Sequence, residues 1–330
     1  MTILVTGASG HVGLTLILKL LETGQKVRAL DLKKNPTIEQ LPIEFIQADV
    51  RNLDTLAPAF RDVEVVYHVA AYISIQMHEW PLLEAINVNG VRNIVTLCQQ
   101  YRVRRLVHFS SIEALSVEPH NKPIDETNAL VPADFSIPYP RSKAAGQRII
   151  LQAIQEGLDA VTLFPTGIIG PNDYSTRASN QSLIPIANGE MPVLAKFAYD
   201  WVDVRDVAEG ALAAAQKAPA GASYILGNQH YLITDLAAKI AALTGVPAPR
   251  AVPAWMAQSV LPFLSLRSRI TGQTSMLTRA SLYPLLHSHQ ISHERAAREL
   301  GYRPRPIDES LADMVNWFQK LGKIRIHKTA

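Results

Sequence analysis

The stretch Thr2-Ile3-Leu4-Val5-Thr6-Gly7-Ala8-Ser9-Gly10-His11-Val12-Gly13 opens as a short buried strand and continues into a glycine-rich turn. An apolar segment follows at 14–21, so we predict a strand, a tight turn and a helix over 11–22. Gly7 permits the sharp turn, Gly10 leaves space for a ligand at the backbone, and Gly13 lets the helix pack close to the strand. The free N–H groups at the start of such a helix attract phosphates. We therefore predict a dinucleotide site with contacts at Gly7, Ser9, Gly10, His11, Val12 and Gly13.

The composition is that of a folded globular protein. The chain has 330 residues, of which 48% are hydrophobic and 18% charged. Its net charge of +3 is spread along the sequence, which argues against a nucleic-acid partner. The single cysteine, Cys98, excludes an internal disulfide and is expected in the core. The first strand begins at Thr2, and the apolar stretch 254–266 is too short for a bilayer, so we expect a cytoplasmic protein without a membrane span.

Strand-like and helix-like segments alternate through the first half of the chain. We predict further strands at 26–31, 44–47, 63–70, 106–111 and 160–164, and helices at 52–60, 81–100 and 140–156. Strands separated by helices of this length form right-handed βαβ units and a parallel sheet with both faces covered. The predicted fold class is therefore α/β, with a Rossmann-type doubly wound parallel sheet.

The pattern becomes less regular after Pro165, where prolines and glycines accumulate and the elements shorten. We predict an NAD-binding domain at 1–165 and a smaller, mainly helical substrate lobe at 166–330. Some segments of that lobe are expected to return to the sheet. The lobe is expected over the ends of the strands, where a substrate binds in folds of this kind.

The cofactor preference depends on Asp31, which ends the second strand eighteen residues after Gly13. A carboxylate at this position bonds the adenosine ribose and repels a 2′-phosphate, which favours NAD. Lys33 and Lys34 follow it and weaken the preference, so NADP remains the alternative. Further cofactor contacts are expected near the ends of the strands, at Lys33, Asp49, Val50, Val69, Ala70, Ala71 and Ser110.

A phenol and an ammonium lie four residues apart in Tyr139-Pro140-Arg141-Ser142-Lys143. Pro140 suits the first turn of a helix, so both groups project from one face. A free tyrosine titrates near pH ~10, and we expect the Lys143 ammonium and a positive nicotinamide to lower the pKa of Tyr139. Tyr139 then exchanges a proton with a substrate oxygen while hydride moves to or from nicotinamide C4. Ser110 and Ser111 end the fifth strand, where one hydroxyl is expected to hold that oxygen.

With this glycine turn and this tyrosine–lysine pair, the sequence resembles the extended short-chain dehydrogenases/reductases over nearly its whole length. Ser110-Ser111-Ile112-Glu113 and Pro138-Tyr139-Pro140-Arg141-Ser142-Lys143 are similar to 3β-hydroxysteroid dehydrogenases. Trp201-Val202-Asp203-Val204-Arg205-Asp206-Val207-Ala208 and Glu299-Leu300-Gly301-Tyr302-Arg303-Pro304 are similar to bacterial dihydroflavonol-reductase-like proteins. The resemblance implies Ser111, Tyr139 and Lys143 as the catalytic set, with Lys143 also on the nicotinamide ribose. It further implies Asn87 near the cofactor, Pro165 and Ile168 beside the nicotinamide, and a homodimer through helices 81–100 and 140–156.

We therefore predict an NAD(H)-dependent oxidoreductase that interconverts a secondary alcohol and a ketone on a bulky hydrophobic small molecule. The expected substrate contacts are Tyr72, Ile73, Ser111 and Tyr174. Three further apolar side chains are expected in the core instead, namely Trp255, Met256 and Phe263.

Two alternative functions stay open, whereas a dehydratase is disfavoured because Ile112 stands where dehydratases of this kind carry an aspartate. A nucleotide-sugar epimerase is the first alternative. The chain has Tyr199-Asp200-Trp201 where many such enzymes carry a pyrophosphate-binding arginine, although Arg177 or Arg205 can replace it. A non-catalytic dinucleotide sensor is the second alternative, and the presence of both Tyr139 and Lys143 argues against it.

The histidines do not predict a metal site. His287, His289 and His293 lie on a strand-to-helix stretch that separates them, and no cysteine or well-placed carboxylate completes a ligand set. His68 lies within an apolar run, which favours a hydrogen-bonded core histidine.

Overall fold

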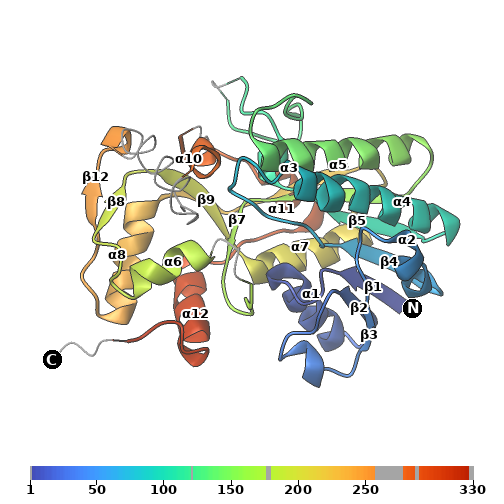
Figure 1. Cartoon of the computed structure of the whole chain (residues 1–330), viewed down its shortest axis with the longest axis horizontal. Helices are drawn as coiled ribbons and strands as arrows, with labels where there is room; N and C mark the ends of the chain where they lie inside the picture. The colour runs from blue at the N-terminus through green and yellow to red at the C-terminus, as the bar shows by residue number, and fades with distance from the viewer. Residues whose placement is uncertain (1, 120–121, 176–179, 257–277, 287–289, 327–330) are drawn as a thin grey trace.

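The computed structural model describes residues 2–119, 122–175, 180–256, 278–286 and 290–326 (Figure 1). A seven-stranded sheet forms its centre, in the order β10-β6-β5-β4-β1-β2-β3, and every neighbouring pair is parallel. Its strands are β1 (Thr2–Thr6), β2 (Lys26–Asp31), β3 (Glu44–Gln47), β4 (Val63–His68), β5 (Arg105–Phe109), β6 (Ala160–Pro165) and β10 (Ser223–Leu226). The strand order reverses between β1 and β4, and ligands of such sheets bind outside the carboxyl ends of the strands at that point.

Helices cover both faces of this sheet (Figure 1). α1 (His11–Glu22) and α7 (Val204–Lys217) pack together on one face, over Val5 and Val107. α4 (Val91–Gln100) and α5 (Pro138–Gln155) pack together on the other face, over Leu4 and Leu106. The alternation of side chains along each strand therefore divides the core into two apolar layers. The predicted doubly wound α/β fold is confirmed.

Several predicted elements differ in detail from the structure. The helix predicted at 81–100 is α3 (Trp80–Leu83), a π-helical turn η3 (Glu84–Gly90) and then α4. The helix predicted at 52–60 is α2 (Leu53–Leu56) followed by the 3₁₀ turn η2 (Ala57–Phe60). The fourth strand ends at His68 and not at residue 70, because the Ala70 N–H leaves the ladder and donates to Thr6 Oγ1. Two further 3₁₀ turns are η1 (Ile38–Gln40) and η4 (Ile112–Ala114).

The chain after Pro165 builds a second lobe, which lies to the left in Figure 1, and returns to the main sheet through β10 and α7. Its small sheets are β11-β9-β7 and β12-β8. Their strands are β7 (Gly167–Ile169), β8 (Val193–Ala195), β9 (Ala198–Asp203), β11 (Gln229–Leu232) and β12 (Arg250–Val252). The helices of this half, besides α7, are α6 (Asn180–Ala187), α8 (Ile233–Thr244), α10 (Arg279–Leu286), α11 (Glu294–Leu300) and α12 (Ile307–Lys320). α6, α8 and α12 share one apolar core with Trp201.

The predictions of which single side chains are buried in the core are confirmed for some residues and wrong for others. Cys98 and His68 are buried, as predicted. The prediction that Trp255 and Met256 lie in the core was wrong, since their side chains are 64% and 40% exposed. Both residues follow β12 at the rim of the second lobe, where no element covers them among the described residues. Phe263 lies outside the described residues.

Candidate active site

The glycine turn at the start of α1 has the geometry that its sequence predicts. Gly7 adopts a left-handed conformation with φ +68°, and a Cβ there would lie 2.7 Å from the Ala70 nitrogen. A Cβ at Gly13 would lie 2.1 Å from the Gly7 carbonyl oxygen, so the helix reaches the strand only because position 13 is glycine. Gly10 is the N-cap of α1, and within α1 the first turn has neither a side-chain cap nor an acidic residue. Its N–H groups therefore suit the phosphates of a dinucleotide.

Asp31 lies beside this turn at the carboxyl end of β2. Its carboxylate accepts hydrogen bonds from the Ser9 N–H at 2.8 Å and the Leu32 N–H at 2.7 Å. Burial raises the pKa of Asp31, while these two N–H groups and Lys33 oppose the rise. Ser9 Oγ donates to the Lys33 carbonyl at 2.6 Å, which holds the loop after β2 against the glycine turn. The loop and the turn thus form one continuous rim at the carboxyl end of β2.

The remaining predicted cofactor contacts differ in how they are placed. Among those at the strand ends, Asp49 pairs with Arg51, which holds the pKa of Asp49 low. Val50 packs against Gly90, and Ala71 is exposed. The His11 side chain lies away from the turn, with Nε2 2.8 Å from the Pro171 carbonyl oxygen, and burial lowers its pKa. Val12, Val69 and Ile168 contact the apolar layer under α1 and α7, while Pro165 and Ser110 are buried at the ends of β6 and β5.

The three predicted catalytic side chains meet at the carboxyl end of β5. Ser111 follows β5 and accepts a hydrogen bond from the Glu113 N–H at 3.3 Å. Its hydroxyl also lies close to the phenol of Tyr139, in the first turn of α5. Lys143, one turn further, donates from Nζ to the Phe109 carbonyl oxygen at 2.7 Å. The fold thus brings together a hydroxyl, a phenol and an amine from two elements that lie apart in the sequence.

The electrostatic environment of Tyr139 differs from the expectation. Burial and the negative charge of Glu113 raise the pKa of Tyr139, and the Ser111 hydroxyl opposes the rise. The expected lowering by Lys143 is therefore wrong for the protein alone. Burial also lowers the pKa of Lys143 to about 8, since the side chain is only 5% exposed. Both pKa values thus move in the direction that stabilises the neutral form, because a buried charge is poorly solvated.

Asn87 connects three parts of the site from the π-helical turn η3. Its Oδ1 accepts from the Tyr72 N–H at 2.8 Å, and its Nδ2 donates to the Tyr72 carbonyl at 2.9 Å and to Ser142 Oγ at 3.0 Å. A Cβ at Gly146 would lie 2.4 Å from the Asn87 carbonyl oxygen, so α5 packs tightly on this turn. Asn87 thereby holds the loop after β4 against the helix that carries Tyr139 and Lys143.

The predicted substrate contacts divide into two groups. Tyr72 and Ile73 lie in the loop that Asn87 holds, and Ile73 is 43% exposed. Tyr174 lies elsewhere: its hydroxyl is 2.9 Å from Thr37 Oγ1, and its ring packs edge-on against Trp317. Thr37 follows β2, so Tyr174 is on the adenosine side of the site and not beside Tyr139.

Two residues near Tyr139 were missed as site residues. The charge of Glu113 acts on the phenols of both Tyr139 and Tyr199, and burial raises the pKa of Glu113 to about 7. Glu113 follows Ser111 by two residues, so its position beside the predicted serine was the available signal. Tyr199 belongs to β9, and no local pattern in the sequence relates that strand to α5.

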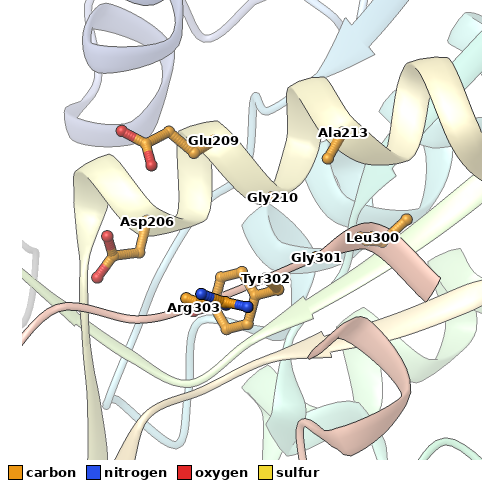
Figure 2. Close-up of a pocket in the computed structure, with 8 residues that line it drawn as sticks. All are labelled: Asp206, Glu209, Gly210, Ala213, Leu300, Gly301, Tyr302 and Arg303. Carbon is orange, nitrogen blue, oxygen red and sulfur yellow. The ribbon is translucent and has the colours of Figure 1, made fainter. Parts of the chain in front are cut away.

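Two cavities lie outside this set of residues. The smaller, of about 140 Å³, lies between α7 and the segment after α11 and is lined by Asp206, Glu209 and Tyr302 among others (Figure 2). Its carboxylates are already paired, Asp206 with Arg305 and Glu209 with Lys19 and Arg305. The larger, of about 290 Å³, is mostly apolar and is lined by Ser116, Val117, Glu118, Val131, Pro132, Phe135 and Tyr283. Its lining residues Ser116 and Val117 follow the turn η4, which carries Glu113, and burial with the charges of Glu118 and Glu113 raises the pKa of Tyr283.

Proteins that combine this strand order with a tyrosine and a lysine at the start of α5 form the class of extended short-chain dehydrogenases/reductases. The signature of the NAD dependent epimerase/dehydratase family matches residues 3–227, and the chain belongs to that family. The resemblance seen in the sequence is thereby confirmed, and the protein is an NAD(P)-dependent enzyme of this family.

Full-length relatives agree with this assignment. Sterol demethylase protein B of Methylococcus capsulatus (strain Bath) is 32% identical over 98% of this chain and 100% of its own. Short-chain dehydrogenase/reductase family 42E member 1 of Homo sapiens is 27% identical over 97% of this chain and 88% of its own. The crystal structure of gox2253 is similar with a TM-score of 0.84 and 30% identity, and covers 98% of this chain and 99% of its own.

The structure contains no sign of a metal site or a membrane span within its described residues. No three His, Cys, Asp or Glu side chains among them gather as metal ligands, and His287 and His289 fall outside the described ranges. None of the helices in the described part of the chain is long and apolar enough to cross a membrane.

Proposed function

We propose that the protein interconverts a secondary alcohol and a ketone on a bulky hydrophobic molecule, with NAD as the hydride carrier. The observation that carries the proposal is the close approach of the Ser111 hydroxyl to the Tyr139 phenol, beside the anchored amine of Lys143 at the carboxyl end of β5. This set supplies a proton donor and an oxygen clamp at the edge of the sheet where the dinucleotide turn also lies.

The proposed roles follow from the protonation states of these residues. In ketone reduction, Tyr139 is a neutral phenol and gives its proton to the substrate oxygen, which Ser111 holds by a hydrogen bond. In alcohol oxidation, the same oxygen returns a proton to the Tyr139 phenolate. Bound oxidised NAD supplies the hydride acceptor and a positive ring, which favours that phenolate. Lys143, fixed on Phe109, adds positive charge when it is protonated.

A hydrophobic substrate is supported by two independent observations. The apolar cavity of about 290 Å³ is lined by residues that follow the turn η4 after Ser111, and the exposed Ile73 lies in the loop that Asn87 holds beside α5. The relative from Methylococcus capsulatus carries the word sterol in its name, so a hydroxysteroid is the first substrate class to test, and a dihydroflavonol the second.

The epimerase alternative is weakened by the position of Arg205. Its guanidinium is bonded to Asp203 and Asp313, at 2.8 and 2.7 Å, so it does not replace the missing pyrophosphate-binding arginine. Arg177 lies outside the described residues. We also propose NAD over NADP, on the position of Asp31, and a homodimer through α4 and α5, which size-exclusion chromatography with light scattering will test.

A spectrophotometric screen at 340 nm tests the function. NAD and NADP are each tested with hydroxysteroids, other bulky alcohols, dihydroflavonols and simple sugars. We expect NADH to accumulate with a hydrophobic alcohol, and Tyr139→Phe to lose at least about a hundredfold in rate while NAD affinity stays within a few-fold. Tyr224→Phe is the matched control, since that hydroxyl bonds Glu299 of α11 and its ring packs on the face of the sheet opposite α5. Activity retained in Tyr139→Phe, or inversion of a sugar centre without NADH formation, would contradict the proposal.

A further inference from the structure

A tyrosine of the second lobe packs beside the proposed catalytic groups. Tyr199 of β9 lies against an apolar cluster that includes Ile112 and Ala144. Ile112 directly precedes Glu113 in the turn η4, and Ala144 directly follows Lys143 in α5. The turn and the helix also pack on each other. The strand β9 thus brings a phenol of the second lobe to the place where η4 meets α5.

The ring of Tyr199 is held firmly by its neighbours. One edge of the ring rests on Gly167, where a Cβ would lie 2.9 Å from Cε1 of the tyrosine. The ring also packs edge-on against Trp201, with the two centroids 5.8 Å apart. These contacts involve the ring alone, so they fix the side chain and leave its hydroxyl available to a ligand.

Two polar groups at this place have no partner in the described part of the chain. Neither the Tyr199 hydroxyl nor the Glu113 carboxylate forms a hydrogen bond there. Both residues are half-buried, and neither group is among the polar atoms that are fully closed off from water. Burial and the charge of Glu113 raise the pKa of Tyr199 and of Tyr139, in agreement with the packing. The site therefore holds a donor and an acceptor that the protein itself does not pair.

A bulky hydrophobic substrate that fills this site displaces water from both groups. A polar group that is left unpaired in the complex weakens binding, so the site rejects ligands that cannot pair it. An ionised carboxylate only accepts hydrogen bonds and a phenol can donate one, so one hydroxyl oxygen between them satisfies both. An ammonium would also pair with Glu113, but the protonated Lys143 and an oxidised nicotinamide would repel it. A neutral hydroxyl is the group that fits.

We propose that Tyr199 and Glu113 select a substrate with a second hydroxyl, one or two carbons away from the reacting carbon. Tyr199 donates to this hydroxyl, and the hydroxyl donates to the Glu113 carboxylate. Ser111 and Tyr139 meanwhile hold the reacting oxygen. The inference rests on the proposed function, because it concerns the substrate of that same site. The substrate class is a hydrophobic diol, which loses a hydride to NAD and a proton to Tyr139 and becomes the hydroxyketone.

Binding to the NADH complex tests the inference without turnover, because an alcohol finds no hydride acceptor there. The probes are a hydroxysteroid and the same steroid with a second hydroxyl, placed on the adjoining carbon or on the next one. Calorimetry is carried out at about pH 8.5, above the pKa of about 7 of Glu113, so that the carboxylate is ionised. We expect one of the diols to bind at least about tenfold more tightly than the single alcohol, and Tyr199→Phe to abolish this preference.

The outcomes of this experiment separate the inference from the proposed function. Equal affinities for the single alcohol and both diols would overturn the inference alone, as would a preference that Tyr199→Phe retains. Failure of every alcohol to bind would overturn the proposed function and the inference with it. The variant is expected to fold normally, since the hydroxyl that it removes has no partner among the described residues.

Steady-state kinetics at 340 nm give a second measurement, with a single alcohol and a diol that are both oxidised. The ratio of kcat/KM for the diol to kcat/KM for the single alcohol should fall at least about tenfold in Tyr199→Phe, mainly through KM. Tyr224→Phe is the control, because its hydroxyl bonds Glu299 and its ring lies on the opposite face of the sheet. A merely structural role of Tyr199 would lower both values alike, and an unchanged ratio would refute the inference.

Discussion

Replacing Lys143 with methionine is expected to stabilise the folded protein at neutral pH, although it removes a proposed catalytic group. Burial lowers the pKa of Lys143 from 10.5 to about 8. At roughly 1.4 kcal/mol per pKa unit, this lowering is a penalty of about 3 kcal/mol on the folded state. The variant loses the bond from Nζ to the Phe109 carbonyl oxygen, which costs about 1–2 kcal/mol. The expected net gain for Lys143→Met at pH 7 is therefore about 1–2 kcal/mol.

This gain in stability depends on pH in a defined direction. Below pH 8, the lysine is charged in both the folded and the unfolded chain, so the full penalty applies to the wild type. As pH rises from about 8 toward 10.5, the folded lysine loses its proton first and the penalty disappears. The advantage of the variant is expected to shrink by about 2 kcal/mol between pH 7 and pH 9.5.

Urea unfolding at these two pH values, followed by tryptophan fluorescence, measures the effect. Lys217→Met is the matched control, because Lys217 Nζ donates to the Leu300 carbonyl at 2.9 Å from an exposed position. The control loses the same kind of hydrogen bond without relieving a buried charge, so it should gain nothing at pH 7. If Lys143→Met is less stable than the wild type at pH 7, or its gain is the same at both pH values, the electrostatic reasoning is wrong.

Three further perturbations are expected to separate positioning, cofactor choice and acid–base balance. Gly146→Ala places a Cβ 2.4 Å from a backbone oxygen of η3, so α5 must move by about 1 Å and kcat should fall about a hundredfold. Gly210→Ala meets side-chain atoms and no backbone, Leu226 at 2.8 Å and Tyr302 at 3.3 Å, and should stay active. Asp31→Ser should raise kcat/KM for NADP relative to NAD by about tenfold or more, measured at 340 nm, and an unchanged ratio would remove the carboxylate from cofactor choice. Glu113→Gln removes a charge that raises the pKa of Tyr139, so the pH profile of alcohol oxidation should move to lower pH by up to about one unit, and an unmoved profile would contradict that coupling.

The first half of the fold was predictable because its signals are local. The glycine turn fixes where β1 ends and α1 begins, and β2, β3 and α1 have the bounds that the sequence predicts. The π-helical turn η3 was not predictable, since the side-chain spacing of residues 81–100 fits one continuous α-helix. The turn lies where the Asn87 backbone meets α5 at Gly146, a tertiary contact that no local pattern in the sequence indicates.

The candidate site was predictable where its residues follow strands of the main sheet. Ser111 and Tyr139 meet because parallel strands end at one edge, which the alternation of strands and helices already implied. Tyr174 and Tyr199 show the limit of that argument. Both belong to the less regular second half, where the path of the chain places Tyr174 on the adenosine side and Tyr199 near Tyr139. Exposure was equally unpredictable there, since Trp255 is apolar and yet faces the solvent.

Burial opposes charge on all three ionisable groups around the proposed substrate oxygen. The pKa of Tyr139 is raised, that of Glu113 is raised to about 7, and that of Lys143 is lowered to about 8. The protein alone therefore presents a neutral phenol, the form that carries a proton for the substrate oxygen and accepts none, which suits ketone reduction. Oxidation needs the opposite state of Tyr139, and a positive nicotinamide ring nearby favours it, whereas the neutral reduced ring does not. The direction of proton transfer then follows the oxidation state of the bound cofactor. One tyrosine thus serves both directions, and burial together with the charge of Glu113 sets how far its pKa must fall before oxidation begins.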